Sequence, residues 1–126
     1  MAKEIFITTD APAPIGPYNQ AIKAGNLLFI SGQIALVPGT SELADTDIKV
    51  ETHQVMRNLK AILYAAGADF HNVVKTTIFL NDMSLFTDVN EIYGSYFDSD
   101  YPARETVAVK GLPKNVRVEI SMIASL

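Results

Sequence analysis

The C-terminal stretch, residues 101–124, constrains the fold most, because it reads as two strands around a Gly-Leu-Pro-Lys-Asn turn. Successive side chains of a strand point to opposite faces of a sheet. In the second strand one face is apolar and is predicted to be core; its residues are Val116, Val118, Ile120 and Met122. The opposite face carries Arg117, Glu119 and Ser121. Arg104 begins the first strand, and a hairpin is expected to bring it near Glu119.

The rest of the chain predicts further strands and two helices. Short strands are expected at residues 4–8, 20–24, 27–31 and 73–80. Apolar residues recur at helical spacing from about 48 to 66 and again from 85 to 97. The order β-β-β-α-β-α-β-β predicts one α+β domain over residues 1–126, with a mixed sheet and both helices on one face.

Such an arrangement leaves the other face of the sheet without cover from the same chain. That face is predicted to mix apolar residues (Phe79, Ile123) with polar ones (Lys75, Thr77, Arg117, Glu119). Hydrophobic residues make up 48% of the chain and charged residues only 19%. Because an uncovered, partly apolar face favours association, we expect a homo-oligomer joined through this sheet face.

Composition excludes several kinds of chemistry. The chain has no cysteine, so it has neither disulfides nor a thiolate nucleophile. The net charge of −4 and the lack of a basic run argue against nucleic-acid binding. His53 and His71 have no acids at metal-ligand spacing, so no metal site is expected. No apolar run is long enough to span a bilayer, and a cytoplasmic protein is the expectation.

Two residues are candidates for chemistry, and each also has a structural interpretation. Arg104 can be a surface ion-pair partner or a bidentate clamp for a carboxylate. Glu119 can pair with Arg117 or Arg104 across the sheet, or act as a general acid or base whose pKa is raised by burial. Composition and spacing alone therefore indicate only a soluble oligomeric domain.

Six segments, in order from about residue 10 to residue 124, resemble the signature of the Rid family, the reactive-intermediate deaminases also called YjgF-type proteins. They are IGPYNQA (15–21), ISGQI (30–34), VKTTIFL (74–80), VNEIY (89–93), YPARETV (101–107) and LPKNVRVEI (112–120). The resemblance implies a chorismate-mutase-like, ferredoxin-like homotrimer with clefts between subunits. It also implies hydrolysis of enamines and imines, such as 2-aminoacrylate or 2-aminocrotonate from pyridoxal-phosphate-dependent dehydratases, to 2-oxo acids and ammonia.

The same resemblance assigns roles to individual residues. Arg104 matches the residue that holds the substrate carboxylate, and Glu119 matches the acid that positions and activates water. The residues implied to line the cleft are Tyr18, Ser31, Gly32, Asn90 and Thr106. Thr106 departs from the best-studied branch, which has cysteine there. No cofactor or metal is implied.

The sequence is also compatible with two other functions. The cleft could bind 2-oxo acids or related carboxylates without turnover, as a regulatory module. Some relatives have been described as ribonucleases or translation inhibitors, a role that the acidic charge of this chain disfavours.

Overall fold

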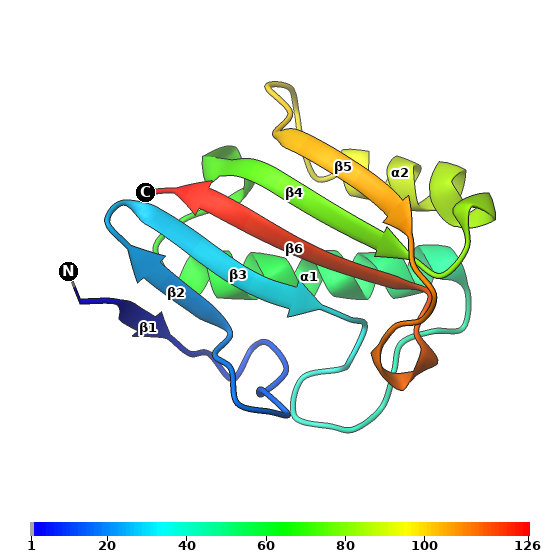
Figure 1. The fold of residues 1–126 in the computed structure, drawn as a ribbon, viewed down its shortest axis with the longest axis horizontal. Helices are drawn as coiled ribbons and strands as arrows, with labels where there is room; N and C mark the ends of the chain where they lie inside the picture. The colour runs from blue at the N-terminus through cyan, green and yellow to red at the C-terminus, as the bar shows by residue number, and fades with distance from the viewer. Residues whose placement is uncertain (1) are drawn as a thin grey trace.

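The computed structural model describes residues 2–126, and its strands form one six-stranded sheet in the order β1-β2-β3-β6-β4-β5 (Figure 1). The strands are β1 (Glu4–Phe6), β2 (Ala21–Ala24), β3 (Leu27–Gln33), β4 (Val73–Leu80), β5 (Ala103–Ala108) and β6 (Val118–Ser125). The helices are α1 (Ile48–Ala65) and α2 (Phe86–Gly94), with short 3-10 turns η1 (Phe70–Asn72), η2 (Met83–Leu85) and η3 (Pro113–Asn115). The predicted α+β class, mixed sheet and two helices are confirmed.

The two C-terminal strands do not form the predicted hairpin. β6 pairs antiparallel with β3 on one side and with β4 on the other, whereas β5 pairs parallel with β4 at the edge of the sheet. The chain crosses from β5 to β6 past the end of β4, where the Val109 amide donates to the Leu80 carbonyl and the Asn81 amide donates to the Arg117 carbonyl. A parallel β4–α2–β5 crossover therefore places β4 between the two strands.

This strand order separates Arg104 from Glu119. Arg104 lies in register with Thr76 of β4, and Thr76 with Met122 of β6, so Arg104 belongs to the face that the helices cover. Glu119 lies in register with Phe79 on the opposite, open face. The expectation that the two residues meet within one chain is wrong, since it assumed direct pairing of β5 with β6.

Helix α1 begins and ends where the sequence predicts, to within a residue. The Asp47 side chain accepts a hydrogen bond from the Val50 amide at 2.9 Å and so caps the first turn. After the helix, Gly67 has a φ of +75°, a left-handed conformation that glycine adopts without a steric cost. Buried apolar side chains from α1 pack on β3 and β6 to form the core; they include Val55, Met56, Leu59, Ile62 and Leu63.

Helix α2 is shorter than predicted. The polar residues at 81–84 cap a separate turn, because Asp82 accepts from the Ser84 amide within η2 and α2 begins only at Phe86. α2 ends at Gly94, and Phe97 packs beyond it on Phe70 and Tyr93 with ring centroids 5.4 and 5.0 Å apart. Tyr93 also donates to the Thr76 hydroxyl at 3.0 Å, which ties α2 to the helix-covered face of β4.

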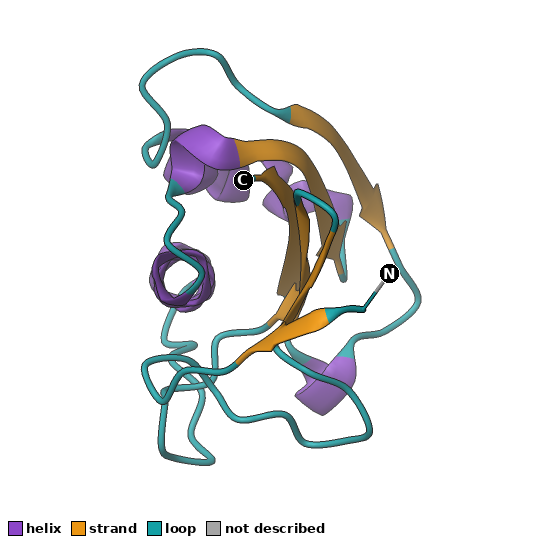
Figure 2. Cartoon of the chain, turned by 90° about the vertical axis from the view of Figure 1, so that its left-hand side faces the viewer, coloured by secondary structure: helices purple, strands orange, loops and turns teal. Residues whose placement is uncertain are grey.

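Within residues 2–126, neither α1 nor α2 covers one face of the sheet, as predicted (Figure 2). Four apolar residues lie in register across this open face on β1, β2, β3 and β6: Ile5, Ile22, Phe29 and Ile123. Ile5 and Phe29 are 48% and 43% exposed. Arg117 was expected on this face but turns toward α1. Over residues 2–126, neither helix has the length and apolar content needed to cross a membrane.

Candidate functional site

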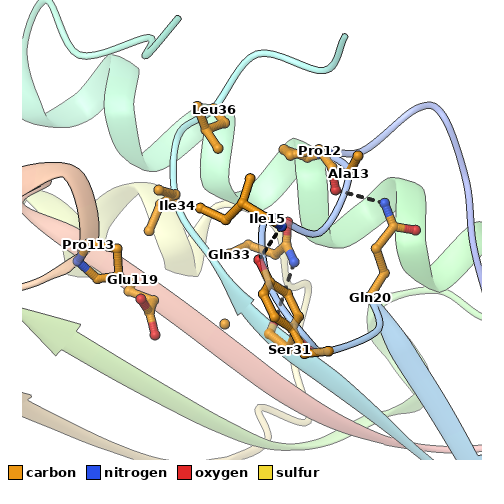
Figure 3. A pocket seen from close by; sticks show the side chains of 12 residues that line it. Pro12, Ala13, Ile15, Gln20, Ser31, Gln33, Ile34, Leu36, Pro113 and Glu119 are labelled. Atoms are coloured by element: carbon orange, nitrogen blue, oxygen red, sulfur yellow. Dashed lines mark hydrogen bonds between the residues drawn. The ribbon is translucent and has the colours of Figure 1, made fainter. Parts of the chain in front are cut away.

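Four of the predicted site residues line one cavity of about 370 Å³ on the open side of β3 and β6 (Figure 3). Tyr18 comes from the loop before β2, Ser31 and Gly32 from β3, and Glu119 from β6. The remaining wall is largely apolar and includes Pro12, Ala13, Ile15, Ile34, Leu36 and Pro113. A single carboxylate therefore faces a cavity with few other charged groups.

An irregularity in β3 opens the strand at this cavity. The pairing of β3 with β6 shifts register between Ile30 and Gln33, which leaves Ser31 and Gly32 out of the regular ladder. Ser31 is held in place because its hydroxyl donates to the Asn19 carbonyl at 2.6 Å and its amide donates to the Gln20 carbonyl at 2.9 Å. Gly32 faces the side chain of Glu119, and a Cβ at this position would lie 2.9 Å from Glu119 Cδ and still closer to Oε2. The absence of a side chain at Gly32 thus makes room for the carboxylate.

Replacing Gly32 with alanine is expected to displace the Glu119 carboxylate. A displacement of about 1 Å from the productive geometry can lower a rate on the order of 100-fold. Stability should change little, because the group that must move is the end of a flexible side chain. The catalytic rate of Gly32→Ala measures the effect of the displaced carboxylate, and its thermal unfolding measures the effect on stability. Gly111→Ala is the matched control, since a Cβ at Gly111 meets nothing within 4 Å; equal loss in both variants would contradict the assignment.

Glu119 is half-buried, and burial raises the pKa of its carboxyl above the ordinary value of 4.5. Within residues 2–126, no hydrogen bond or ion pair to this carboxylate is formed. The alternative that Glu119 pairs with Arg117 is wrong, because Arg117 Nε donates to Glu51 Oε1 at 2.7 Å instead. An unpaired acid with a raised pKa keeps its proton to a higher pH than a solvated carboxyl does, and it can exchange that proton with a ligand in the cavity.

Gln20 shapes the same cavity, although the sequence interpretation gave it no role beyond the start of a strand. It is 2% exposed; its Oε1 accepts from the Thr8 amide at 2.8 Å, and its Nε2 donates to the Thr8 carbonyl at 3.0 Å and the Pro12 carbonyl at 2.8 Å. Tyr18 stabilises the turn in the loop before β2, because its hydroxyl accepts a hydrogen bond from the Ile15 amide at 3.3 Å. The prolines of this loop lack an amide proton, so the loop has few donors for its own carbonyl groups. A polar side chain such as Gln20 is therefore needed to supply them, and the prolines were the sequence signal for its role.

Arg104 and Asn90 form a second group beside α2. Arg104 Nη1 donates to Asn90 Oδ1 at 2.7 Å, and the guanidinium carbon lies 5.2 Å from the ring centroid of Tyr93 and 5.7 Å from that of Phe86. These contacts orient the planar guanidinium while leaving other N–H groups to donate. The hollow in front of it measures about 460 Å³ and is also lined by Tyr101 and Pro102. Burial raises the pKa of Tyr93, so its phenol stays neutral next to the cation.

Thr106 lies on the same face of β5 as Arg104, two positions further along the strand. Its hydroxyl oxygen is buried and has no hydrogen-bond partner among residues 2–126. A buried hydroxyl without a partner is costly, and this one lies on the face of β5 that carries Arg104. Thr106 therefore belongs with Arg104 and Asn90 rather than with Glu119.

The predicted residues thus divide into two half-sites. The acid half-site contains Tyr18, Ser31, Gly32 and Glu119, and the arginine half-site contains Asn90, Arg104 and Thr106. Among residues 2–126, no three His, Cys, Asp or Glu side chains are grouped so that they could hold a metal ion. The His53 ring instead hydrogen-bonds the Tyr96 hydroxyl at 2.8 Å.

Fold and half-sites together define a small α+β protein with an arginine held beside aromatic rings and a separate, partly buried acid. Comparison with known proteins identifies the family to which this chain belongs. Residues 8–126 match the family model described as endoribonuclease L-PSP. The chain is 53% identical to the RutC family protein PH0854 of Pyrococcus horikoshii, over 97% of both chains. It is 48% identical to the mouse 2-iminobutanoate/2-iminopropanoate deaminase, over 97% of this chain and 90% of that one.

A solved structure agrees with these relatives. The Rid-family protein YyfA of Yersinia pestis superimposes with a TM-score of 0.96 at 44% identity, over 99% of this chain and all of that one. The chain belongs to the Rid family, as its six motifs indicated.

Proposed function

We propose that this protein is a hydrolytic deaminase of short-lived 2-imino and 2-enamino acids, which it converts to 2-oxo acids and ammonia. The observation that carries the proposal is Glu119, a half-buried carboxylate with a raised pKa and no partner among residues 2–126, held opposite Gly32 in a cavity. The deaminase name of the mouse relative supports the same chemistry.

The active site is proposed to form between chains of a homotrimer. Arg104 and Glu119 lie on opposite faces of the sheet, so they do not share one cavity within a chain. The exposed apolar row on the open face is a feature that a neighbouring chain would cover. The arginine half-site of one subunit would then face the acid half-site of the next.

In such a site the chemistry needs only positioned side chains. The Arg104 fork binds the substrate carboxylate with two charge-assisted hydrogen bonds, and Asn90 keeps the fork in place. The oxygen of water bonds to the imine carbon while Glu119 accepts a proton from that water and the C=N electron pair moves to nitrogen. Glu119 then returns the proton to nitrogen, which gives a carbinolamine. Glu119 next takes the proton of the new hydroxyl and passes it to the amino nitrogen, so that the C–N bond breaks, ammonia leaves and the oxygen becomes the 2-oxo group. Enamine substrates tautomerise to the imine first.

The direct test is release of 2-oxo acid and ammonia from 2-aminoacrylate generated by a dehydratase in the same cuvette. The protein should accelerate release above the uncatalysed rate. If release is not accelerated while carboxylates still bind, the site belongs to a binding protein and the deaminase proposal is wrong.

Mixing two inactive variants tests the shared site. Arg104→Ala keeps the acid half-site, and Glu119→Gln keeps the arginine half-site. If each site takes one half from each of two neighbours, random 1:1 trimers should contain complete sites at about a quarter of positions. We expect co-expressed variants with different tags, purified through both tags, to regain about a third of wild-type turnover, because the homotrimers are removed and each mixed trimer holds one complete site among three. Activity no higher than that of the single variants would place both halves in one subunit.

The description of the matching family model raises ribonuclease activity as a second candidate. The net charge of −4 disfavours it, because phosphate contacts depend on clustered Lys and Arg. RNA binding that weakens steeply with salt would support this alternative, and its absence would remove it.

A further inference from the structure

The buried face of α1 carries a line of polar residues among its apolar ones. Glu51, Gln54 and Asn58 are 0%, 9% and 1% exposed. Polar groups buried in a core are costly unless they are hydrogen-bonded. Their partners therefore show what these residues do.

The partners lie in the walls of the acid half-site. Asn58 Nδ2 donates to the carbonyls of Ile34 and Leu36 at 3.0 and 2.9 Å, and both of those residues line the Glu119 cavity. Gln54 Nε2 in turn donates to Asn58 Oδ1 at 2.9 Å. One turn toward the start of the helix, Glu51 contacts the chain just before β6. The polar line on α1 thus connects the segment that follows β3 with the residue that precedes β6.

Four hydrogen bonds hold Arg117 in place. Glu51 accepts from its backbone amide at 2.8 Å and from its Nε at 2.7 Å. Its Nη2 donates to the Asp45 carbonyl at 2.9 Å, and its own carbonyl accepts from the Asn81 amide at 3.0 Å. In a regular strand Arg117 and Glu119 would point to the same face, since they are two positions apart. The contact with Glu51 turns Arg117 toward α1, while Glu119 faces the cavity.

We propose that Glu51 is a positioning residue, whose buried ion pair with Arg117 sets where β6 starts and so holds the Glu119 carboxylate opposite Gly32. The catalytic meaning of this position rests on the deaminase function proposed above. The pair is weak evidence for a role in stability, because apolar residues of similar volume often replace a buried ion pair without loss, and the Arg117 side chain is also 34% exposed. A fixed position for the strand that carries the acid is a role that packing alone would not provide.

Two variants separate positioning from folding. Glu51→Gln with Arg117→Met removes both charges, yet the glutamine oxygen can still accept from the amide of residue 117. Arg117→Lys keeps the charge pair but presents a single ammonium in place of the guanidinium fork. The matched control removes the exposed pair of Lys49 and Glu91, which lie 3.2 Å apart on α1 and α2, as Lys49→Met with Glu91→Gln.

We expect a graded fall in kcat of the folded proteins. The control should match the wild type, Arg117→Lys should fall several-fold, and the double variant should fall on the order of 10- to 100-fold with little change in KM. The pKa of Glu119, followed by carbon NMR of labelled glutamate, should move down toward the ordinary value as the carboxylate gains solvent.

The outcomes distinguish a failure of the positioning role of Glu51 from a failure of the proposed deaminase function. A Glu119 pKa that is the same in the wild type, Arg117→Lys and the double variant overturns the positioning role, whatever happens to the melting temperature. If the pKa shifts while even the wild type has no deaminase activity, the positioning role stands and the proposed function fails.

Discussion

Replacing Arg104 with alanine is expected to abolish turnover while the fold persists. The variant loses two charge-assisted hydrogen bonds to the substrate carboxylate, each contributing about 1.5–3 kcal/mol, so kcat/KM should fall by at least about 100-fold. Within the chain it loses one hydrogen bond to Asn90 and its stacking on Tyr93 and Phe86. Such stacking contributes about 0.5–1 kcal/mol at exposed sites, too little to unfold a domain. Steady-state kinetics with circular dichroism and gel filtration measure these effects.

Two further variants make this result specific. Arg104→Lys retains the charge but not the planar fork, and we expect it to recover only a small part of the lost activity. Lys60→Ala is the control, because Lys60 also lies over an aromatic ring, that of Tyr64, on the outer side of α1. Full activity of Arg104→Ala would remove the carboxylate clamp from the mechanism, and loss of assembly would assign Arg104 a structural role.

Replacing Glu119 with glutamine is expected to lower kcat on the order of 100-fold or more, the range typical of a lost general acid or base. Affinity for substrate should change less, because the carboxylate of the substrate is held by Arg104. In the wild type, kcat/KM should rise with pH as Glu119 loses its proton, and this rise should occur above pH 4.5 because burial raises its pKa. Glu119→Gln should lack that rise. An unchanged rate would exclude Glu119 as the proton acceptor.

The same substitution has a predicted effect on stability. The pKa of Glu119 is higher in the folded than in the unfolded chain. The free energy of unfolding of the wild type therefore decreases as pH rises above 4.5 and through the pKa of Glu119 in the folded chain. Glutamine does not ionise, so Glu119→Gln should melt at or above the wild-type temperature at pH 7. The difference should shrink as pH falls toward 4 and below. A variant less stable at neutral pH would show that Glu119 has a stabilising partner in the assembled protein.

The alternation of β6 and the helical spacing of residues 48–66 predicted the core correctly, because both follow from local backbone geometry. Val118, Ile120 and Met122 are at most 2% exposed. The partner of β5 could not be predicted this way. A turn between two strands suggests a hairpin, but the choice of β4 over β6 depends on a crossover through α2 that local pattern does not encode.

Residue chemistry and strand alternation pointed to Arg104 and Glu119 as candidates, and the family motifs added the other residues of the candidate site. The division of these residues between the two faces of the sheet depends on strand order. Glu51 was missed because a glutamate within a helix usually indicates a solvent-exposed position. Its true signal was placement on the same helix face as Val55 and Asn58, one turn and two turns away.

The close approach of Gly32 to Glu119 has a consequence for the way this sequence can diverge. The two positions are distant along the chain, yet a side chain at the first displaces the carboxylate at the second. Descendants that keep a glutamate at position 119 should therefore keep glycine at position 32, whereas those that lose the acid are free to acquire alanine or serine there. In an alignment of relatives the pair should vary together, so a substituted glycine would mark members that have lost the acid at position 119.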